Sequence, residues 1–204
     1  MKLAVIGATG NMGQRLTKEA TSRGHQVTAI SRNPEAAKAN GASNAVACDL
    51  SNADKLADAI RGADAVILSV KFQENDVKPV FEALRKAGVN RLAVVGGAAS
   101  LFNQDNVRLI DQPGFPDFIK VEAGPAAAAL DWIRGNVKDI DWVFVSPSMM
   151  LQPGDRTGKF RLGKDHLLVD DQGNSSISYE DLSVAILDEL EKPQHHRERF
   201  TVGY

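Results

Sequence analysis

Three glycines near the start of the chain have the spacing that a nucleotide-phosphate site needs. They follow the pattern GxxGxxG between an apolar stretch and a predicted amphipathic helix, in the heptapeptide Gly7-Ala8-Thr9-Gly10-Asn11-Met12-Gly13. Gly7 permits a tight turn, Gly10 leaves room for a pyrophosphate against the backbone, and Gly13 lets the helix pack closely. N–H groups at the positive end of the helix would then stabilise the phosphate charge. The loop predicts dinucleotide binding; the alternative is a glycine-rich turn without a ligand.

The residue that selects between NAD and NADP is expected about 20 residues further on, at the end of the second strand. Ser31 and Arg32 occupy this position, and neither is acidic. A carboxylate there would repel a 2′-phosphate, whereas a guanidinium can pair with it through two hydrogen bonds. We therefore expect NADP(H) to be preferred over NAD(H). The alternative is that Arg32 is a solvated charge beside a turn.

Two further strand ends carry residues that could contact the adenosine half of such a cofactor. Asp49 and Leu50 follow the third expected strand, where a short polar side chain and an N–H group could hold the adenine edge; alternatively, Asp49 or Ser51 caps the next helix. Ser69, Val70 and Lys71 end the fourth expected strand, at the edge where cofactors lie, and are expected near the ribose or the pyrophosphate. Cys48 is expected to be a small buried apolar residue, not a nucleophile.

The elements that must position these residues alternate along the first 150 residues. Continuous apolar runs predict strands buried on both faces of a parallel sheet, at residues 3–6, 26–31, 45–49, 65–70, 92–95 and 142–145. Helical patterns lie between them, at residues 12–23, 35–40, 54–61, 77–87 and 117–134. This alternation predicts an α/β fold with a Rossmann-type doubly wound parallel sheet and helices on both faces.

The last quarter of the chain, residues 151–204, has a different pattern. Short strands are expected at residues 159–163 and 167–169, and a final strand at 199–202. Between them, Ser178 is a plausible N-cap for a helix that ends before a proline. We expect a small C-terminal α+β extension on the substrate side of a single NAD(P)-binding domain spanning residues 1–204.

The composition excludes several classes of protein. The 204 residues include 24 Lys and Arg against 26 Asp and Glu, so the net charge is −2. This balance argues against a nucleic-acid binder and against attraction to anionic membranes. The single cysteine excludes an internal disulfide, and the 4 histidines lack the spacing of a metal site. The chain begins on a strand-like run without a separate signal peptide, so a cytoplasmic protein is expected.

Taken together, these motifs resemble the atypical short-chain dehydrogenase/reductases. The similarity is to the NAD(P)H-binding, NmrA-like branch, which includes NADH-flavin reductases and biliverdin-reductase-B-like proteins. It is carried by the glycine loop, Arg32, Asp49-Leu50 and the segments 94–101, 142–147, 153–158 and 177–182. The resemblance adds Gly96 and Pro147 to the expected cofactor-binding residues. It leaves the substrate open, because the group includes both enzymes and redox-sensing regulators.

One departure from the family pattern bears on the chemistry. The wider family reduces carbonyls with a Tyr-x-x-x-Lys pair, in which the tyrosine donates a proton and the lysine helps to hold the phenolate and the ribose. Here Pro116 stands four residues before Lys120, and neither Tyr179 nor Tyr204 forms the motif. A proton relay of the family type is therefore not expected. Lys120 either contacts the cofactor ribose or lies in solvent at the start of a helix.

The missing tyrosine favours acceptors that need no dedicated acid. Hydride transfer depends mainly on positioning, but a ketone also needs a proton from a general acid. A flavin or quinone takes up hydride as a delocalised anion that solvent can protonate. We therefore expect an NADPH-dependent oxidoreductase acting on a flavin, quinone or similar aromatic, conjugated acceptor, with flavin as substrate and not as bound cofactor. The alternatives are an NADP(H)-binding redox sensor without turnover and, less favoured, an isomerase or epimerase.

The acceptor is expected above the nicotinamide, at the carboxyl edge of the sheet. Ser100 follows the fifth expected strand and could hydrogen-bond an acceptor oxygen. Met149 and Met150 could form an adaptable wall of the site, although packing in the core or a loop is the favoured alternative. His166 could reach the substrate. The sequence predicts no oligomeric state.

Overall fold

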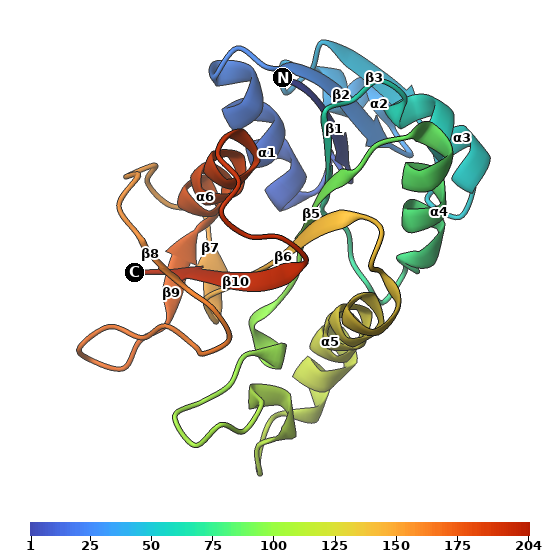
Figure 1. Cartoon of the computed structure of the whole chain (residues 1–204). Helices are drawn as coiled ribbons and strands as arrows, with labels where there is room; N and C mark the ends of the chain where they lie inside the picture. Colours follow the sequence, from blue (N-terminus) through green and yellow to red (C-terminus); the bar gives the residue numbers. More distant parts are fainter.

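A sheet of eight strands runs through the middle of the molecule, in a computed structural model that describes residues 1–204 (Figure 1). Its order is β3-β2-β1-β4-β5-β6-β10-β8, and only β8 is antiparallel to its neighbour. The strands are β1 (Lys2–Ile6), β2 (Gln26–Ser31), β3 (Asn44–Ala47), β4 (Ala65–Leu68), β5 (Arg91–Val95), β6 (Asp141–Pro147), β8 (Arg161–Gly163) and β10 (Glu198–Gly203). A second, two-stranded sheet pairs β7 (Met150–Gln152) with β9 (Ser176–Ser178).

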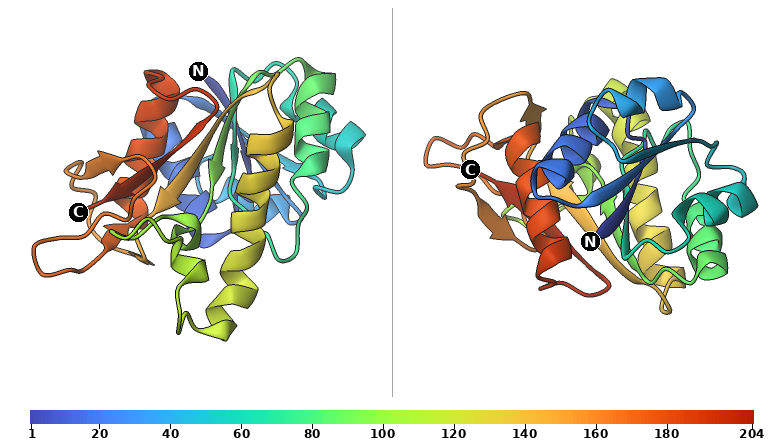
Figure 2. Two further views of the ribbon diagram at one scale, coloured as in Figure 1. Left: turned by 60° about the horizontal axis from the view of Figure 1, so that its bottom comes forward. Right: turned by 90° about the horizontal axis from the view of Figure 1, so that it is seen from above.

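Helices cover both faces of the main sheet (Figure 2). One face carries α1 (Asn11–Ser22), α6 (Tyr179–Glu191) and the short α2 (Pro34–Lys38). The other face carries α3 (Ala53–Ile60), α4 (Lys78–Ala87) and α5 (Asp117–Asn136). Two short 3-10 helices, η1 (Ala98–Ser100) and η2 (Leu109–Asp111), lie between β5 and α5.

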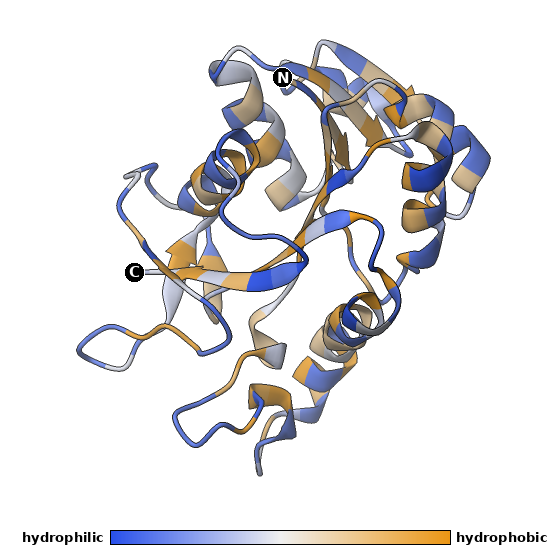
Figure 3. Cartoon of the chain, viewed as in Figure 1, coloured by the Kyte–Doolittle hydropathy of each residue, from blue (hydrophilic) through white to orange (hydrophobic).

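The strands supply side chains to two cores at once. Ala4 and Ile6 of β1 belong to a core of 24 buried residues beneath α3, α4 and α5. Leu3 and Val5 belong to a core of 23 buried residues beneath α1 and α6. Both faces of the strand are therefore buried, which explains its continuous apolar sequence. In Figure 3 the hydrophobic colours follow the central strands, and the outer loops are mainly hydrophilic.

The chain order creates a crevice at one edge of the sheet. From β1 the chain proceeds to β2 and β3 in one direction, then returns to place β4 against the other side of β1. The connections that leave β1 and β4 therefore diverge at their carboxyl ends, where ligands of open α/β sheets bind. Gly7 turns out of β1 at this point with a positive φ of 81°, which glycine adopts without strain.

The doubly wound sheet, its six expected parallel strands and its C-terminal extension are confirmed, with three corrections. The strand expected at 167–169 is wrong: this segment is irregular, and the only pairing beside it is a bridge between the preceding His166 and Phe102. The strand expected at 159–163 is limited to Arg161–Gly163. The small β7–β9 sheet was not expected. None of the helices combines the length and apolar character needed to cross a membrane.

Candidate cofactor-binding site

A cleft of about 570 Å³ follows the carboxyl ends of β1 to β5. Its floor is formed by residues that come directly after each strand, from the turn after β3 to Gly97 after β5. Most of the expected cofactor-binding residues line it: Gly7, Thr9, Gly10, Asn11, Met12, Ser31, Arg32, Asp49, Leu50, Ser69, Val70 and Gly96. A long cleft at the switch point of an open α/β sheet has the place that a dinucleotide takes in such folds.

The three glycines of the loop are needed for different structural reasons. A Cβ on Gly7 would lie 1.9 Å from the Ser69 carbonyl oxygen, and one on Gly13 would lie 2.1 Å from the Gly7 oxygen. These two positions are therefore fixed by packing. A Cβ on Gly10 would meet only the Gly7 oxygen, at 3.4 Å, so the space that Gly10 leaves open belongs to the cleft.

The start of α1 is prepared for an anion. Gly10 is its N-cap, no side chain caps the helix, and its first turn contains no acidic residue. The Gln14 side chain donates to the Thr9 carbonyl oxygen at 2.8 Å and holds the loop against the helix. The first N–H groups of the helix are thus left for a ligand, and they carry the positive end of the helix dipole. The cradle fits a diphosphate.

Three charged side chains converge where the cleft passes the ends of β2 and β4. The Arg32 guanidinium lies 3.9 Å from one Glu74 carboxylate oxygen, and the Lys71 ammonium lies 3.9 Å from the other. Arg32 is 80% exposed, so these contacts contribute little to stability. All three residues line the cleft. The structure therefore presents two cations, with one competing carboxylate, where a 2′-phosphate is expected.

Asp49 has a local partner that the sequence did not indicate. Its carboxylate accepts hydrogen bonds from the Ser51 N–H at 2.9 Å and the Ser51 hydroxyl at 2.7 Å. These bonds, helped by Arg32, hold the pKa of Asp49 below its usual range. The cap of α3 is Asn52, which accepts from the Lys55 N–H. The alternative that Asp49 or Ser51 caps this helix is therefore wrong, and Asp49 lines the cleft.

Three expected cofactor residues lie behind the lining of the cleft. Ala8 is fully buried in the core beneath α1, and its N–H donates to the Ile30 carbonyl oxygen. Gly13 packs on the loop, and Pro147 is buried at the end of β6. Gly96 does line the cleft, and a Cβ there would lie 1.9 Å from the Phe144 ring. The cofactor contacts of Ala8, Gly13 and Pro147 stay predictions.

The two expected catalytic residues lie outside the cleft lining. Ser100 is only 4% exposed, and its hydroxyl accepts a hydrogen bond from the fully buried Arg199 at 3.0 Å. Lys120 lies in the first turn of α5, beyond the N-cap Pro116, and pairs with Asp117 at 3.4 Å. Their catalytic roles stay predictions. In the structure, Ser100 accepts a hydrogen bond from Arg199 and Lys120 forms an ion pair with Asp117.

The residues expected at the acceptor side are dispersed. Met149 and Met150 are 60% and 57% exposed, so the interpretation that they pack in the core is wrong. The His166 ring contacts the Asn106 side-chain oxygen at 2.9 Å on the surface. None of these three residues lines the cleft.

Other cleft residues were missed by the sequence analysis. Phe72 and Glu74 come from the connection between β4 and α4, which carries no motif; the neighbouring Lys71, expected there with Ser69 and Val70, also lines the cleft. Tyr179, the first residue of α6, reaches the cleft from an element about 170 residues after the glycine loop. Its distance along the chain from the motif concealed this role, although the preceding Ser178 was recognised as a helix cap.

The fold and the glycine cradle together define a Rossmann-type dinucleotide-binding protein. The chain belongs to the NAD(P)H-binding family, whose sequence profile matches residues 7–193. The resemblance inferred from the motifs is thereby confirmed at the level of the family and its oxidoreductase fold.

Individual relatives agree along the whole chain. The uncharacterized protein YwnB of Bacillus subtilis is 39% identical over 217 residues, which cover 99% of this chain and 98% of that protein. A solved structure from Burkholderia pseudomallei, named provisionally as an exported protein, is 41% identical with a TM-score of 0.90 over 100% of both chains. A structure from Streptococcus pneumoniae, named provisionally as an NADH-flavin reductase, is 34% identical with a TM-score of 0.87 over 100% of this chain and 99% of that one.

Proposed function

We propose that this protein is an NADPH-dependent oxidoreductase that reduces a flavin, a quinone or a similar conjugated acceptor. The observation that carries the proposal is the single cleft that joins an uncapped, glycine-lined helix start to a pair of cations. The first feature suits a pyrophosphate and the second a 2′-phosphate. When bound, the reduced nicotinamide supplies two electrons and one proton as a hydride.

The chain's own residues bind and orient the cofactor. The N–H groups at the start of α1 hold the diphosphate, and the missing side chain of Gly10 lets it approach the backbone. Asp49 and Leu50 line the part of the cleft beside the cation pair, where the adenine would lie. Gly96 and Gly97, at the end of β5, leave the opposite part open for the nicotinamide.

Preference for NADPH follows from the charges of the adenosine end. A hydrogen bond between charged partners is worth about 1.5–3 kcal/mol, or roughly 10-fold to 100-fold in affinity. Because Arg32 is highly exposed, the lower end of this range applies. The Glu74 carboxylate lies beside both cations and would repel the 2′-phosphate, so we expect a modest preference for NADPH over NADH.

The choice of acceptor follows from where the proton sources lie. The Lys120 ammonium pairs with Asp117 outside the cleft lining, and Pro116 has no proton to give. Flavins and quinones place the smallest demand on a general acid, because their reduced anions are delocalised. The relative named provisionally as an NADH-flavin reductase supports an acceptor of this class.

A turnover assay separates this function from a sensor. The protein is mixed with NADPH and either FMN or a simple quinone, and the absorbance band of reduced nicotinamide is followed. Sustained oxidation above the rate without protein supports the proposal. Tight NADPH binding without acceleration across a panel of flavins and quinones would contradict it and favour a redox sensor.

A further inference from the structure

A second cavity adjoins the cofactor cleft and has no use in the proposed reaction. Its volume is about 510 Å³, within the range of sites that hold a small organic molecule. It lies between α5 and the connection from β4 to α4, and it shares only Phe72, Glu74 and Asn75 with the cleft. Gly96 and Gly97, which are assigned to the nicotinamide end, do not line it. A molecule in this cavity would therefore not be the hydride acceptor.

The sequence of α5 leaves this space open. The residues that line it from the helix are Pro125, Ala128, Ala129 and Trp132. They share one helical face, because the last three lie three, four and seven positions after Pro125. Only Trp132 has a large side chain. Across the gap, the connection is held to α5 by the Gln73 side chain, which donates to a carbonyl oxygen of the helix at 3.5 Å. Small residues on this face thus create the cavity, and the indole ring is its one large apolar wall on the helix.

Two aromatic rings line the cavity, and both are held in place by the core. Trp132 and Phe72 are half-buried against the core beneath α3, α4 and α5. The Trp132 ring packs on the fully buried Phe81 with 5.8 Å between centroids, and Phe72 packs on Phe144 with 6.4 Å. The Lys78 ammonium lies 5.8 Å from the centroid of the Trp132 ring, within reach of a cation–π attraction. Two fixed aromatic rings suit a planar aromatic ligand.

Charge limits which aromatic ligands this cavity can hold. Its lining contains two carboxylates, Glu74 and Asp76, and one ammonium, Lys78, which lies 4.0 Å from Asp76. The cations Arg32 and Lys71 line only the cleft. The lining therefore has more acidic than basic groups, and an anionic ligand would be repelled. A neutral or cationic ring is favoured, because the faces of aromatic side chains attract positive charge.

We infer that this cavity is a second ligand site, for a planar heteroaromatic molecule that is neutral or cationic and stacks on the Trp132 indole. It differs from the dinucleotide cleft, whose glycine loop and cations select phosphates. A nicotinamide dinucleotide is excluded from it, because the diphosphate would enter an acidic lining. Occupancy needs no turnover, so this inference stands or fails separately from the proposed function.

Two tricyclic probes of opposite charge test the site, proflavine as the cation and anthracene-2-sulfonate as the anion. NADP⁺ at saturation keeps the cleft filled. Protein containing 5-fluorotryptophan gives two fluorine resonances, because the chain has 2 tryptophans, and Trp132→Phe removes and thereby assigns one. We expect proflavine to shift the Trp132 resonance in a saturable way, to leave that of the buried Trp142 in place, and to bind at least about threefold more tightly than the sulfonate. No saturable shift of the Trp132 resonance, or tighter binding of the sulfonate, overturns the inference.

Two variants locate the bound probe. Ala128→Arg places a long side chain at the cavity from an exposed helix position, so the protein should fold, and Trp132→Leu removes the stacking surface. We expect each to weaken proflavine binding by about fivefold or more, as loss of a stacked aromatic ring does. The charge-matched control is Ala36→Arg, at an exposed position of α2 outside the cavity and the cleft, and it should bind proflavine like the unmodified protein.

Unchanged affinity for proflavine in folded Ala128→Arg protein overturns the inference. Self-association of the unmodified protein that Ala128→Arg abolishes, measured by sedimentation, also overturns it, because a second copy of the chain would then cover the cavity.

Discussion

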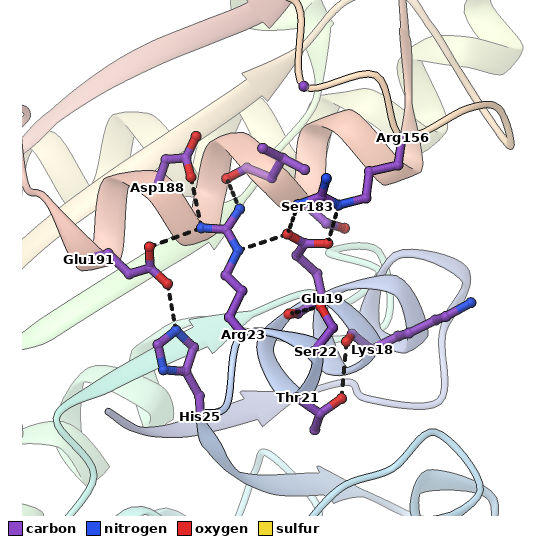
Figure 4. A network of polar contacts seen from close by, with 12 residues as sticks. Lys18, Glu19, Thr21, Ser22, Arg23, His25, Arg156, Ser183, Asp188 and Glu191 are labelled. Carbon is purple, nitrogen blue, oxygen red and sulfur yellow. Dashed lines mark hydrogen bonds and ion pairs between the residues drawn. The ribbon is translucent and has the colours of Figure 1, made fainter.

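Arg156 and Glu19 form a two-point ion pair across the outer face of the molecule (Figure 4). Arg156 Nε and Nη2 donate to the two Glu19 carboxylate oxygens at 2.8 and 2.7 Å. Arg23 donates to the same carboxylate at 2.7 Å and also reaches Asp188 on α6. Glu19 is only 7% exposed. This pair fastens the segment after β7 onto α1, beside the start of α6 that carries Tyr179.

Glu19→Gln should weaken the fold in a pH-dependent way. The Arg156 hydrogen bonds, together with Arg23, hold the pKa of Glu19 below its usual range although burial opposes them. A carboxyl group whose pKa is lowered in the folded state stabilises the protein at pH values above its unfolded-state pKa. This stabilisation is lost as the pH falls through the folded-state pKa. We expect Glu19→Gln to lower the free energy of unfolding by about 1–3 kcal/mol at pH 7. Urea unfolding should show this difference shrinking toward pH 3.

The matched control is Arg61→Gln, which disturbs an exposed pair with Asp58. It should change the free energy of unfolding by less than about 1 kcal/mol at either pH. An equal loss for Glu19→Gln at pH 7 and pH 3 would contradict the assigned role of the ionised carboxylate.

The site residues that could be predicted from the sequence are those in local motifs. The glycine loop and Arg32 follow directly from neighbouring residues, because a loop between a strand and a helix is a local structure. Tyr179 and Glu74 join the cleft only through packing of α6 beside α1 and the path of the connection after β4. No short motif encodes either arrangement.

The errors in the C-terminal part have a similar physical cause. Leu168 gave the segment 167–169 an apolar, strand-like pattern. In the structure its side chain packs against Gly163 and Gly203, and the backbone of the segment forms no strand. Strands β7 and β9 have three residues each and pair only with one another. Segments this short carry too little periodicity to be recognised.

Arg32→Asp should reverse the cofactor preference. The substitution replaces a cation that faces the expected 2′-phosphate with a carboxylate that repels it and can accept a hydrogen bond from a ribose 2′-OH. We expect the NADPH dissociation constant to rise at least about tenfold, with that of NADH equal or lower. Calorimetric titration with both nucleotides measures the ratio, and Arg61→Asp outside the cleft is the charge-matched control. An unchanged ratio would reject this role for Arg32.

Glu74→Gln and Lys71→Met should move NADPH affinity in opposite directions. Glu74 competes with the phosphate for Arg32 and Lys71, so its neutral variant should bind NADPH more tightly, by about 2-fold to 10-fold. Lys71→Met should weaken NADPH by a similar factor and leave NADH nearly unaffected. Asp76→Asn, in the same connection but outside this cleft, is the control. Movement of both variants in the same direction would be inconsistent with a phosphate at this place.

Ser100→Ala distinguishes a structural serine from a catalytic one. Burial lowers the pKa of Arg199, and loss of the Ser100 acceptor would leave one of its buried N–H groups without a partner. We expect a loss of about 1–3 kcal/mol in the free energy of unfolding, with NADPH affinity retained. Denaturant unfolding and a nucleotide titration measure the two quantities. Unchanged stability together with lost turnover would instead establish Ser100 at the acceptor.

The glycine cradle for the diphosphate is the claim on which the remaining roles depend. Gly10→Val tests it, because its backbone is extended and a Cβ there meets only the Gly7 oxygen at 3.4 Å. The fold should therefore accept valine while the larger side chain fills the phosphate space. Gly135→Ala, in α5 with open space around its Cβ position, is the control.

Calorimetric titration of NADPH into the unmodified protein, Gly10→Val and Gly135→Ala tests this claim most directly. We expect one molecule to bind to the unmodified protein and to Gly135→Ala, and binding to Gly10→Val to weaken by about 100-fold or more. Absence of any heat of binding with oxidised or reduced nicotinamide dinucleotides, or full affinity in a folded Gly10→Val protein, would contradict the account.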